Sequence, residues 1–240
     1  MSSAAVLVDV DGTLVDSNYH HTMAWSRALR DHGCNARLAA IHRLVGMGSS
    51  QLLETLIGRS DDKIARSWRA HFDKLLPEIF VVDGGAELLR ALDARGLTVV
   101  LATSSPEDLL DAFRAKIDAD DAIDVVVTAS DVDEAKPEPD VFEASLAKAN
   151  VARDRTAVLG DSIWDARAAV RARLPCVALE TGGFSRAELE GEGVVAVYRD
   201  ATELLDHLEE SPIGMLAVRT GWGSLAHDGS AGRRRRPQSP

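Results

Sequence analysis

Short apolar segments alternate with amphipathic segments of helical periodicity over most of the chain, and this alternation constrains the fold more than any other feature. The apolar segments predict strands at residues 5–9, 98–102, 124–128, 157–160, 176–179 and 194–197. The intervening segments predict helices at residues 85–95, 107–116, 140–149, 163–173 and 202–208. Apolar strands separated by helices are typical of a mostly parallel sheet covered on both faces. We therefore expect a doubly wound α/β fold.

One long segment interrupts the alternation. Between residues 18 and 80 the apolar residues recur at helical spacing, and no segment has the character of a strand. We expect an inserted α-helical cap at residues 17–82, joined through hinges at 15–17 and 82–85 to a Rossmann-like core made of residues 1–16 and 83–210. Residues 211–240 lack periodicity and include four consecutive arginines at 233–236, so we expect a flexible C-terminal tail there.

Charge is distributed unevenly along the chain. The net charge is −11, which disfavours a nucleic acid as a specific partner. The predicted insert holds nine Lys and Arg against six Asp and Glu, a balance of +3, and residues 211–240 carry +4. The remaining core must therefore carry −18. A basic insert over an acidic core would attract a small anionic ligand.

The sequence offers no sign of a membrane or secretory segment. No apolar run approaches the ~20 residues that cross a bilayer, and the N-terminus lacks the basic region of a signal peptide. The two cysteines, Cys34 and Cys176, form neither a CxxC pair nor a disulfide framework. We therefore expect a cytoplasmic protein that does not associate with membranes.

Polar motifs follow several of the predicted strands. They are Asp-Val-Asp-Gly-Thr at 9–13, Thr-Ser-Ser at 103–105, Lys-Pro at 136–137 and a GDxxxD motif at 160–165. The carboxyl ends of parallel strands share one edge of the sheet, where ligands bind. The side chains that we expect to converge there are Asp9, Asp11, Thr103, Lys136, Asp161 and Asp165.

These residue types point to phosphoryl transfer. Carboxylate oxygens are the ligands that Mg²⁺ prefers, and a lysine with a hydroxyl group can hold phosphoryl oxygens. One carboxylate can act as a nucleophile, and a second carboxylate nearby can move the protons. The pattern predicts a reaction that passes through an aspartyl-phosphate.

The ordered motifs resemble those of the haloacid dehalogenase superfamily of phosphohydrolases, over about residues 5–210. The resemblance implies that Asp9 is the nucleophile and a Mg²⁺ ligand, and that Asp11 is the general acid and base with its backbone carbonyl on the metal. It assigns Thr103 to the transferring phosphoryl group and Lys136 to the nucleophile and the phosphate. It assigns Asp161 to Mg²⁺, which Asp165 would support directly or through another ligand.

Further segments resemble the branch that contains phosphoglycolate phosphatases and β-phosphoglucomutases. They are Asp16-Ser17, His21, Trp25, Gly46-Met47-Gly48 and residues 181–185. Gly12 and Ser104 are expected to bind the phosphate, and His21 to contact the substrate or Asp11. The aromatic residues Trp25, Trp68 and Phe72 are expected in the core of the insert. The implied partner is a small phosphorylated metabolite, a sugar phosphate or phosphoglycolate, and the implied state is a monomer or weak homodimer.

Three alternatives remain open at this point. A phosphosugar mutase of the β-phosphoglucomutase type resembles the chain, but that group has a glutamate where this chain has Gly160, and an arginine in the insert where this chain has Gly48-Ser49-Ser50. Both departures favour hydrolysis, although His21 fits either enzyme. A receiver-like signalling protein would lack the helical insert. A catalytically silent binding protein would not need all six converging side chains.

Overall fold

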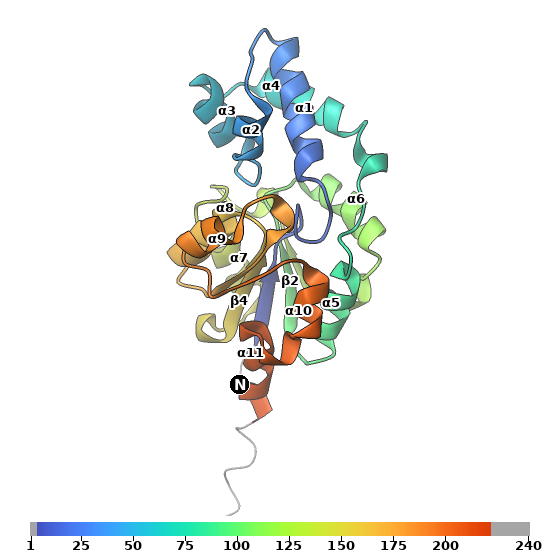
Figure 1. Ribbon diagram of the computed structural model, residues 1–240, viewed down its shortest axis with the longest axis vertical. Helices are drawn as coiled ribbons and strands as arrows, with labels where there is room; N and C mark the ends of the chain where they lie inside the picture. The colour runs from blue at the N-terminus through green and yellow to red at the C-terminus, as the bar shows by residue number, and fades with distance from the viewer. Residues whose placement is uncertain (1–3, 222–240) are drawn as a thin grey trace, which may run out of the picture.

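The computed structural model describes residues 4–221 and contains one six-stranded parallel sheet (Figure 1). The strands are β1 (Ala5–Val8), β2 (Thr98–Ala102), β3 (Val125–Val127), β4 (Thr156–Gly160), β5 (Cys176–Leu179) and β6 (Ala196–Tyr198). Their order is β3-β2-β1-β4-β5-β6, and each neighbouring pair is parallel. The predicted α/β fold with a doubly wound, Rossmann-like sheet is confirmed, and all six strands form within two residues of the expected positions.

Helices cover both faces of the sheet. The α-helices of this part are α5 (Gly85–Asp93), α6 (Glu107–Ile117), α7 (Asp140–Ala149), α8 (Ile163–Arg171), α9 (Arg186–Gly191) and α10 (Ala201–Asp206). Short 3₁₀ turns lie between them: η2 (Asp120–Ala122), η3 (Ala129–Asp131), η4 (Arg153–Arg155), η5 (Glu180–Gly182) and η6 (Leu208–Glu210).

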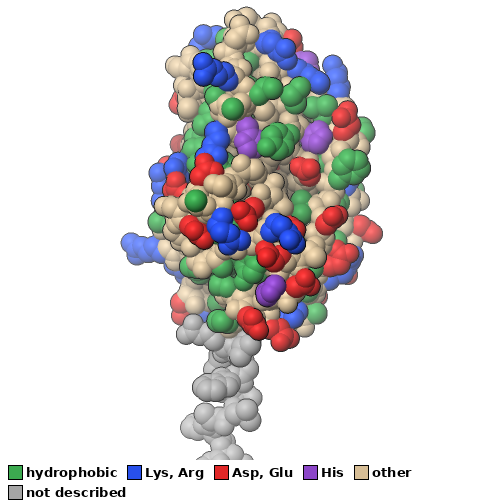
Figure 2. Space-filling view, in the orientation of Figure 1, with side chains coloured by type: hydrophobic (Ala, Val, Ile, Leu, Met, Phe, Trp, Pro, Cys, Tyr) green, Lys and Arg blue, Asp and Glu red, His purple; other side chains and the backbone are tan. Residues whose placement is uncertain are grey.

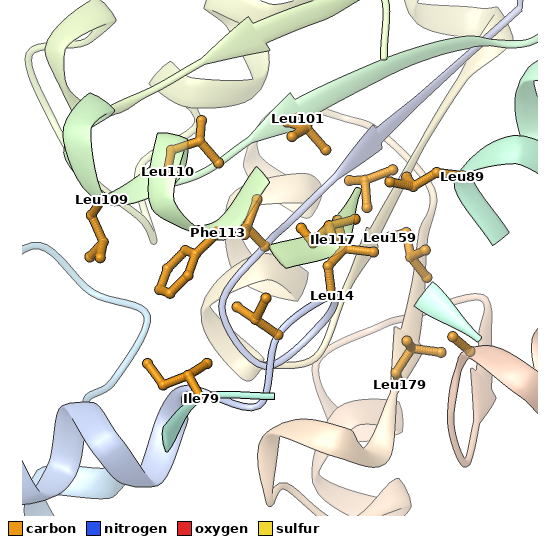
Figure 3. Close-up of a cluster of buried hydrophobic side chains, with 14 of the residues drawn as sticks. Leu14, Ile79, Leu89, Leu101, Leu109, Leu110, Phe113, Ile117, Leu159 and Leu179 are labelled. Carbon is orange, nitrogen blue, oxygen red and sulfur yellow. The ribbon is translucent and has the colours of Figure 1, made fainter. Parts of the chain in front are cut away.

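Strand β1 shows why the strands are apolar along their whole length. Successive side chains of a strand point to opposite faces, and both faces are covered here. Val6 and Val8 belong to the hydrophobic cluster formed with α5, α6 and α10, whereas Leu7 packs in the cluster formed with α7 and α8. Figure 3 shows part of the first cluster, in which Phe113 and Ile117 of α6 lie near Leu14.

A helical lobe stands where the insert is predicted, at the end of the molecule away from the N-terminus (Figure 1). It consists of α1 (Asn18–Asp31), α2 (Leu38–His42), α3 (Ser49–Ile57), α4 (Asp62–Phe72) and η1 (Leu76–Glu78). Helix α4 begins where the side chain of Asp61 accepts a hydrogen bond from the backbone N–H of Lys63. Its buried residues Ile64, Trp68 and Phe72 recur every fourth position, so they form one face that packs against α1.

Two crossing segments join the lobe to the sheet. The N–H of Asp16 donates to the carbonyl of Phe80 at 2.9 Å, and the N–H of Val82 donates to the carbonyl of Leu14 at 2.9 Å. These bonds lie at the two predicted hinges. One hydrophobic cluster extends from the lobe into the sheet part of the molecule. Within it the rings of Phe72 in the lobe and Phe113 in α6 pack edge to face, with their centroids 6.4 Å apart.

The expected flexible tail differs from the structure at its start. Residues Pro212–Gly221 form helix α11, and the side chain of Ile213 is fully buried in the main hydrophobic cluster. Ser211 precedes the proline, and its hydroxyl accepts a hydrogen bond from the N–H of Gly214, as a helix start requires. The prediction of a tail from residue 211 is therefore wrong for this helix, and the rest of it, residues 222–240 with the four arginines, lies outside the described residues.

Two general features of the sequence can also be followed in the structure. Within residues 4–221 no helix has the length and apolar character that a membrane crossing needs. Both cysteines carry free thiols; Cys176 is buried in β5 and Cys34 is partly exposed.

Candidate active site

The chain turns sharply after β1, in a loop that carries both acidic residues of the first motif. The N–H of Gly12 donates to the carbonyl of Val15, and the N–H of Leu14 donates to the carbonyl of Val10, each at 2.8 Å. Gly12 has a φ of +82°, which favours glycine, and a Cβ there would lie 2.2 Å from Oδ2 of Asp161. The turn therefore depends on a glycine beside the carboxylate of Asp161.

Three carboxylates gather at the ends of neighbouring strands. Asp9 follows β1, and Asp161 follows β4, its partner in the sheet. Asp165 lies in the first turn of α8, where its carboxylate and the hydroxyl of Ser162 form a capping box. The three side chains are buried, and one oxygen from each lies within 4.8 Å of the others. The structure thus brings together three of the four residues predicted to serve the metal.

Lys136 completes the charge pattern of this cluster. Its Nζ lies 2.5 Å from Oδ1 of Asp9 and 2.7 Å from Oδ1 of Asp165, and it donates to the carbonyl of Ala102 at 3.2 Å. Its side chain is buried, which alone would lower the pKa, but Asp165 and Asp9 raise the pKa of Lys136 above its ordinary value. The residue therefore stays an ammonium group fixed against Asp9.

Asp9 and Asp161 are held in an environment that favours their neutral forms. Burial raises the pKa of Asp9 to about 7, with Lys136 opposing the rise and Asp165 and Asp11 adding to it. Burial and the charges of Asp9 and Asp165 raise the pKa of Asp161 well above its ordinary value, against hydrogen bonds from Thr13 at 2.7 Å and Asn18 at 2.8 Å.

A bound cation would offset the repulsion between these buried carboxylates. Three buried carboxylates face one ammonium group, so negative charge is in excess. Hard carboxylate oxygens are the ligands that suit Mg²⁺. The residues present therefore fit a divalent cation of this kind.

Asp11 occupies a different environment, and its carboxylate is not part of the three-carboxylate cluster. Oδ1 accepts a hydrogen bond from the hydroxyl of Ser17 at 2.6 Å and lies 2.7 Å from Nε2 of His21, and Oδ2 accepts from the hydroxyl of Ser105 at 2.6 Å. Burial alone would raise the pKa of Asp11, but His21 and the two hydroxyls outweigh burial and lower it. His21 thus contacts Asp11, one of its two expected partners.

The end of β2 supplies neutral donors to the same place. Thr103 is buried and held by a hydrogen bond from its N–H to the carbonyl of Val127 at 3.1 Å, and its hydroxyl accepts from the N–H of Ser105 at 3.0 Å. The hydroxyl of Ser104 is buried, and no hydrogen-bond partner for it occurs among the described residues. Thr103, Ser104 and Ser105 all line the cavity above Asp9.

A cavity of about 210 Å³ lies between this edge of the sheet and the helical lobe. Asp9, Thr103 and Asp161 lie on its sheet side. Trp25 and Trp68 lie on its lobe side, and both are buried, so these expected core residues also form part of the cavity wall. On the face shown in Figure 2, acidic side chains gather over the sheet body while Lys and Arg prevail at the lobe end, in line with the charge division in the sequence.

Several residues of the site escaped the sequence analysis. Thr13, Asn18, Ser17 and Ser105 donate hydrogen bonds to the acidic side chains. Thr13 belongs to the first motif and could have been named from it. Ser17 and Ser105 lie in segments already singled out, Asp16-Ser17 and residues 103–105, but nothing there assigns a role to them, and Asn18 has no local pattern that marks it. Each of the three meets its carboxylate only through the fold.

Gly182 is a further residue whose role needs the fold. A Cβ on Gly182 would lie 1.9 Å from Oδ2 of Asp161, and the carbonyl of Gly182 accepts a hydrogen bond from Asn18 at 3.4 Å. The hydroxyl of the preceding Thr181 donates to the carbonyl of Gly12 at 2.6 Å. The segment that follows β5 thus packs against the loop that follows β1.

The comparisons with known proteins agree with this geometry. Residues 4–173 match the haloacid dehalogenase-like hydrolase family. A phosphoglycolate phosphatase of Rhodospirillum rubrum is 32% identical over 218 residues, covering 85% of this chain and 90% of the relative. The validoxylamine A 7'-phosphate phosphatase of Streptomyces hygroscopicus subsp. limoneus is 28% identical over 203 residues, covering 82% of this chain and 94% of the relative.

A solved structure gives the same result. The crystal structure of a hydrolase from Pseudomonas syringae superimposes with a TM-score of 0.82 at 33% identity, covering 87% of this chain and 99% of that one. The resemblance drawn from the motifs is confirmed, and the receiver-like and catalytically silent alternatives fall away. The chain belongs to the haloacid dehalogenase-like hydrolase family and is an enzyme of the phosphatase kind, a hydrolase of phosphoric monoesters.

Proposed function

We propose that this enzyme hydrolyses small phosphate monoesters, of the sugar phosphate or phosphoglycolate type, through an aspartyl-phosphate on Asp9 and with Mg²⁺ as cofactor. The observation that carries the proposal is the arrangement around Asp9. Its carboxylate faces the cavity beside an ammonium group, and Asp11 lies in the same cavity as a separate carboxylate held by other partners.

In the first half of the reaction a carboxylate oxygen of Asp9 attacks phosphorus, and the bond from phosphorus to the ester oxygen breaks. Lys136 holds the Asp9 carboxylate and offsets negative charge, while Thr103 and Ser104 offer hydroxyl groups to the phosphoryl oxygens. Asp11 gives a proton to the leaving alcohol oxygen; because its pKa is lowered, this step uses the fraction of the enzyme in which Asp11 is protonated.

In the second half water attacks the phosphorus of the aspartyl-phosphate, and the bond to Asp9 breaks to release inorganic phosphate. Asp11, now ionised, takes the proton from that water. The hydrogen bonds from Ser17, Ser105 and His21 stabilise the ionised form and fix its direction. Both halves of the reaction thus use Asp11, whose carboxylate is held in position by Ser17, Ser105 and His21.

Asp9, Asp161 and Asp165 would hold Mg²⁺, with the backbone carbonyl of Asp11 as the further ligand that the family resemblance implies. When bound, the ion would offset the negative charge of the phosphoryl group. Gly12 would allow the backbone of the first loop to approach that group closely.

The mutase alternative is weaker because of Gly160. A Cβ on Gly160 would lie 2.5 Å from Cγ of Asp165, so the carboxylate of Asp165 fills the space that a side chain at residue 160 would need. A glutamate at that position, as expected for a mutase, is not compatible with the observed place of Asp165. This supports hydrolysis and not phosphosugar transfer. We further propose a small phosphorylated metabolite as the partner and a monomer or weak homodimer as the working form.

The test uses phenyl phosphate with Mg²⁺. The wild-type enzyme should release phosphate, and acid quenching during turnover should trap a phosphoenzyme that is stable in acid and labile in base. Asp9→Asn should lose both signals, whereas Asp133→Asn, at an exposed aspartate outside the site, should keep them. A phosphoenzyme or full turnover in the Asp9→Asn variant would remove Asp9 from the role of nucleophile.

A further inference from the structure

We infer that the substrate has a single anionic group, the phosphoryl group itself, and that its alcohol part is an uncharged, ring-shaped polyol. This inference rests on the proposed phosphatase function and narrows it. It favours sugar-like monophosphates over phosphoglycolate and over bisphosphates as substrates.

The lobe side of the cavity provides no full positive charge for a second anion. The described residues that line it from the lobe include neither lysine nor arginine. His21 is the ionisable one among them, and its Nε2 lies against Asp11. On the sheet side, Lys136 already contacts Asp9 and Asp165. A carboxylate or second phosphate would therefore lose its hydration without gaining an ion pair.

Two arginines of the lobe, Arg43 and Arg69, form ion pairs with residues that do not line the cavity. Arg43 pairs with Glu188 at 2.5 Å and lies over the ring of Phe184, and Arg69 pairs with Asp73 and Asp108. The positive balance of the lobe can thus draw an anionic ester toward the enzyme, but it does not extend to the cavity wall.

The wall itself is aromatic and apolar. Trp25 and Trp68 stack with their ring centroids 5.1 Å apart and their planes 14° from parallel, and both line the cavity. Val45, Met47 and Leu52 continue this surface. A ring with a flat face of C–H groups can lie against such a wall, and it buries apolar surface there.

Neutral hydrogen-bond donors on the same walls suit hydroxyl oxygens. Nε1 of Trp68 is buried, and no partner for it occurs in the described part of the chain. A buried indole N–H usually has an acceptor, and a substrate oxygen in the cavity that Trp68 lines would supply one. Helix α3 also starts at this wall, with Gly48 and Ser49, and the first N–H groups of a helix have no partner within it.

The N-terminus of α3 carries a partial positive charge, which by itself would attract an anion. The same cavity, however, contains the carboxylates of Asp9, Asp11, Asp161 and Asp165. Even with Mg²⁺ and the phosphoryl group in place, the charges near the lobe wall do not favour another anion. The cavity is also smaller than a drug-sized site, which limits the alcohol to about one ring.

The experiment compares kcat/KM for phosphate release from four esters with Mg²⁺. They are phenyl phosphate, glucose 6-phosphate, phosphoglycolate and fructose 1,6-bisphosphate. Glucose 6-phosphate should exceed both phosphoglycolate and the bisphosphate by at least about tenfold, the usual effect of one unpaired charged group. Equal or higher values for phosphoglycolate or the bisphosphate would overturn the inference. Failure to hydrolyse phenyl phosphate as well would instead contradict the proposed function, because that ester has no second anion to reject.

Two variants test the walls separately. Ser49→Lys adds an ammonium group to the lobe wall, and Ser49→Gln is its matched neutral control. The lysine variant should gain at least about tenfold in kcat/KM on phosphoglycolate over the glutamine variant, and no gain would contradict the argument from charge.

Trp68→Phe removes the N–H but keeps a ring. It should raise KM for glucose 6-phosphate about three- to tenfold and change KM for phenyl phosphate, whose ring has no acceptor, less than about twofold. Equal changes for the two esters would show that the N–H does not meet the substrate.

Discussion

His21 and Asp11 are joined across the boundary between the helical lobe and the sheet, with Nε2 of His21 2.7 Å from Oδ1 of Asp11. His21 lies in the first turns of α1, whereas Asp11 lies in the loop after β1. Ser17 holds the same oxygen of Asp11, and Ser105, which follows β2, holds the other. The proposed acid and base is therefore positioned by both parts of the molecule at once.

The first prediction concerns turnover by Asp11→Asn. The variant keeps its backbone carbonyl and the three carboxylates that fit Mg²⁺, so its Mg²⁺ affinity should stay within about threefold of the wild type. Its turnover should fall at least about 10²-fold, because no proton can pass through the amide. Isothermal titration with Mg²⁺ and phosphate release from phenyl phosphate measure the two quantities. An unchanged rate would show that Asp11 is not the acid and base.

The second prediction concerns the pH dependence of stability. The pKa of Asp11 lies below the unfolded value of 3.8, so its ionised form stabilises the fold above that pH. This contribution is lost as the pH falls through the folded pKa. In urea unfolding with EDTA at pH 7, Asp11→Asn should lose about 1–3 kcal/mol, since an amide leaves a donor unsatisfied.

The deficit of Asp11→Asn should shrink below about pH 4, when the wild-type carboxyl becomes protonated. Asp16→Asn changes an exposed aspartate of the same loop and should stay within about 0.5 kcal/mol of the wild type at both pH values. A deficit that does not depend on pH would mean that the charge of Asp11 contributes nothing to stability.

The third prediction concerns stabilisation by Mg²⁺. Without metal, the pKa of Asp9 is raised to about 7 by burial, so the fold loses stability as the pH rises from 3.8 through 7 and Asp9 ionises. A divalent cation binds the ionised form, so the rise in Tm produced by Mg²⁺ should be larger at pH 8 than at pH 6. At 100 times Kd the gain is about 2.7 kcal/mol. Asp161→Asn should lose most of this gain, and a rise in Tm that is larger at pH 6 would contradict the assignment.

Much of the fold and of the acidic cluster could be predicted from the sequence because the signals are local. A mostly apolar strand, such as β1 or β4, is stable only in a sheet whose two faces are both covered by other elements. Residues that follow such strands, Asp9 and Asp161, must then lie on one edge of the sheet. That these two strands are neighbours needed the structure.

Of the partners of Asp11, His21 is expected from the family resemblance, as a contact of the substrate or of Asp11. The other two could not be predicted, because they come from separate segments. Ser17 and Ser105 have no spacing in the sequence that links them to residue 11. Likewise, Trp68 has the helical periodicity of a core residue. Nothing in that pattern shows that it lines a cavity, or that its N–H has no partner among residues 4–221. Such details depend on how helices pack, which periodicity does not specify.

The fourth prediction tests the close approach of Gly182 to Asp161. A Cβ at residue 182 would lie 1.9 Å from Oδ2 of Asp161, so Gly182→Ala must displace this carboxylate or the segment itself. Mg²⁺ affinity should fall at least about tenfold, the scale seen when the surroundings of metal ligands are disturbed. The matched control is Gly191→Ala in α9, where a Cβ would meet nothing within 4 Å. Equal Mg²⁺ affinities in the two variants would show that the contact does not position Asp161.

The last prediction concerns helix α11, which the sequence analysis placed in a flexible tail. The sequence signal for this helix is weak. Its uninterrupted apolar run, residues 215–218, is about one helical turn long, and Gly214 and Gly221 lie on either side of that run. Yet Ile213 is fully buried in the main cluster, while Met215 in the same helix is 54% exposed. Ile213→Ala should lower the free energy of unfolding by about 2–4 kcal/mol, because it removes buried methyl groups and leaves a cavity. Met215→Ala should change it by less than about 0.5 kcal/mol. Urea unfolding of the full chain measures both variants, and equal stabilities would mean that α11 does not contribute to the core.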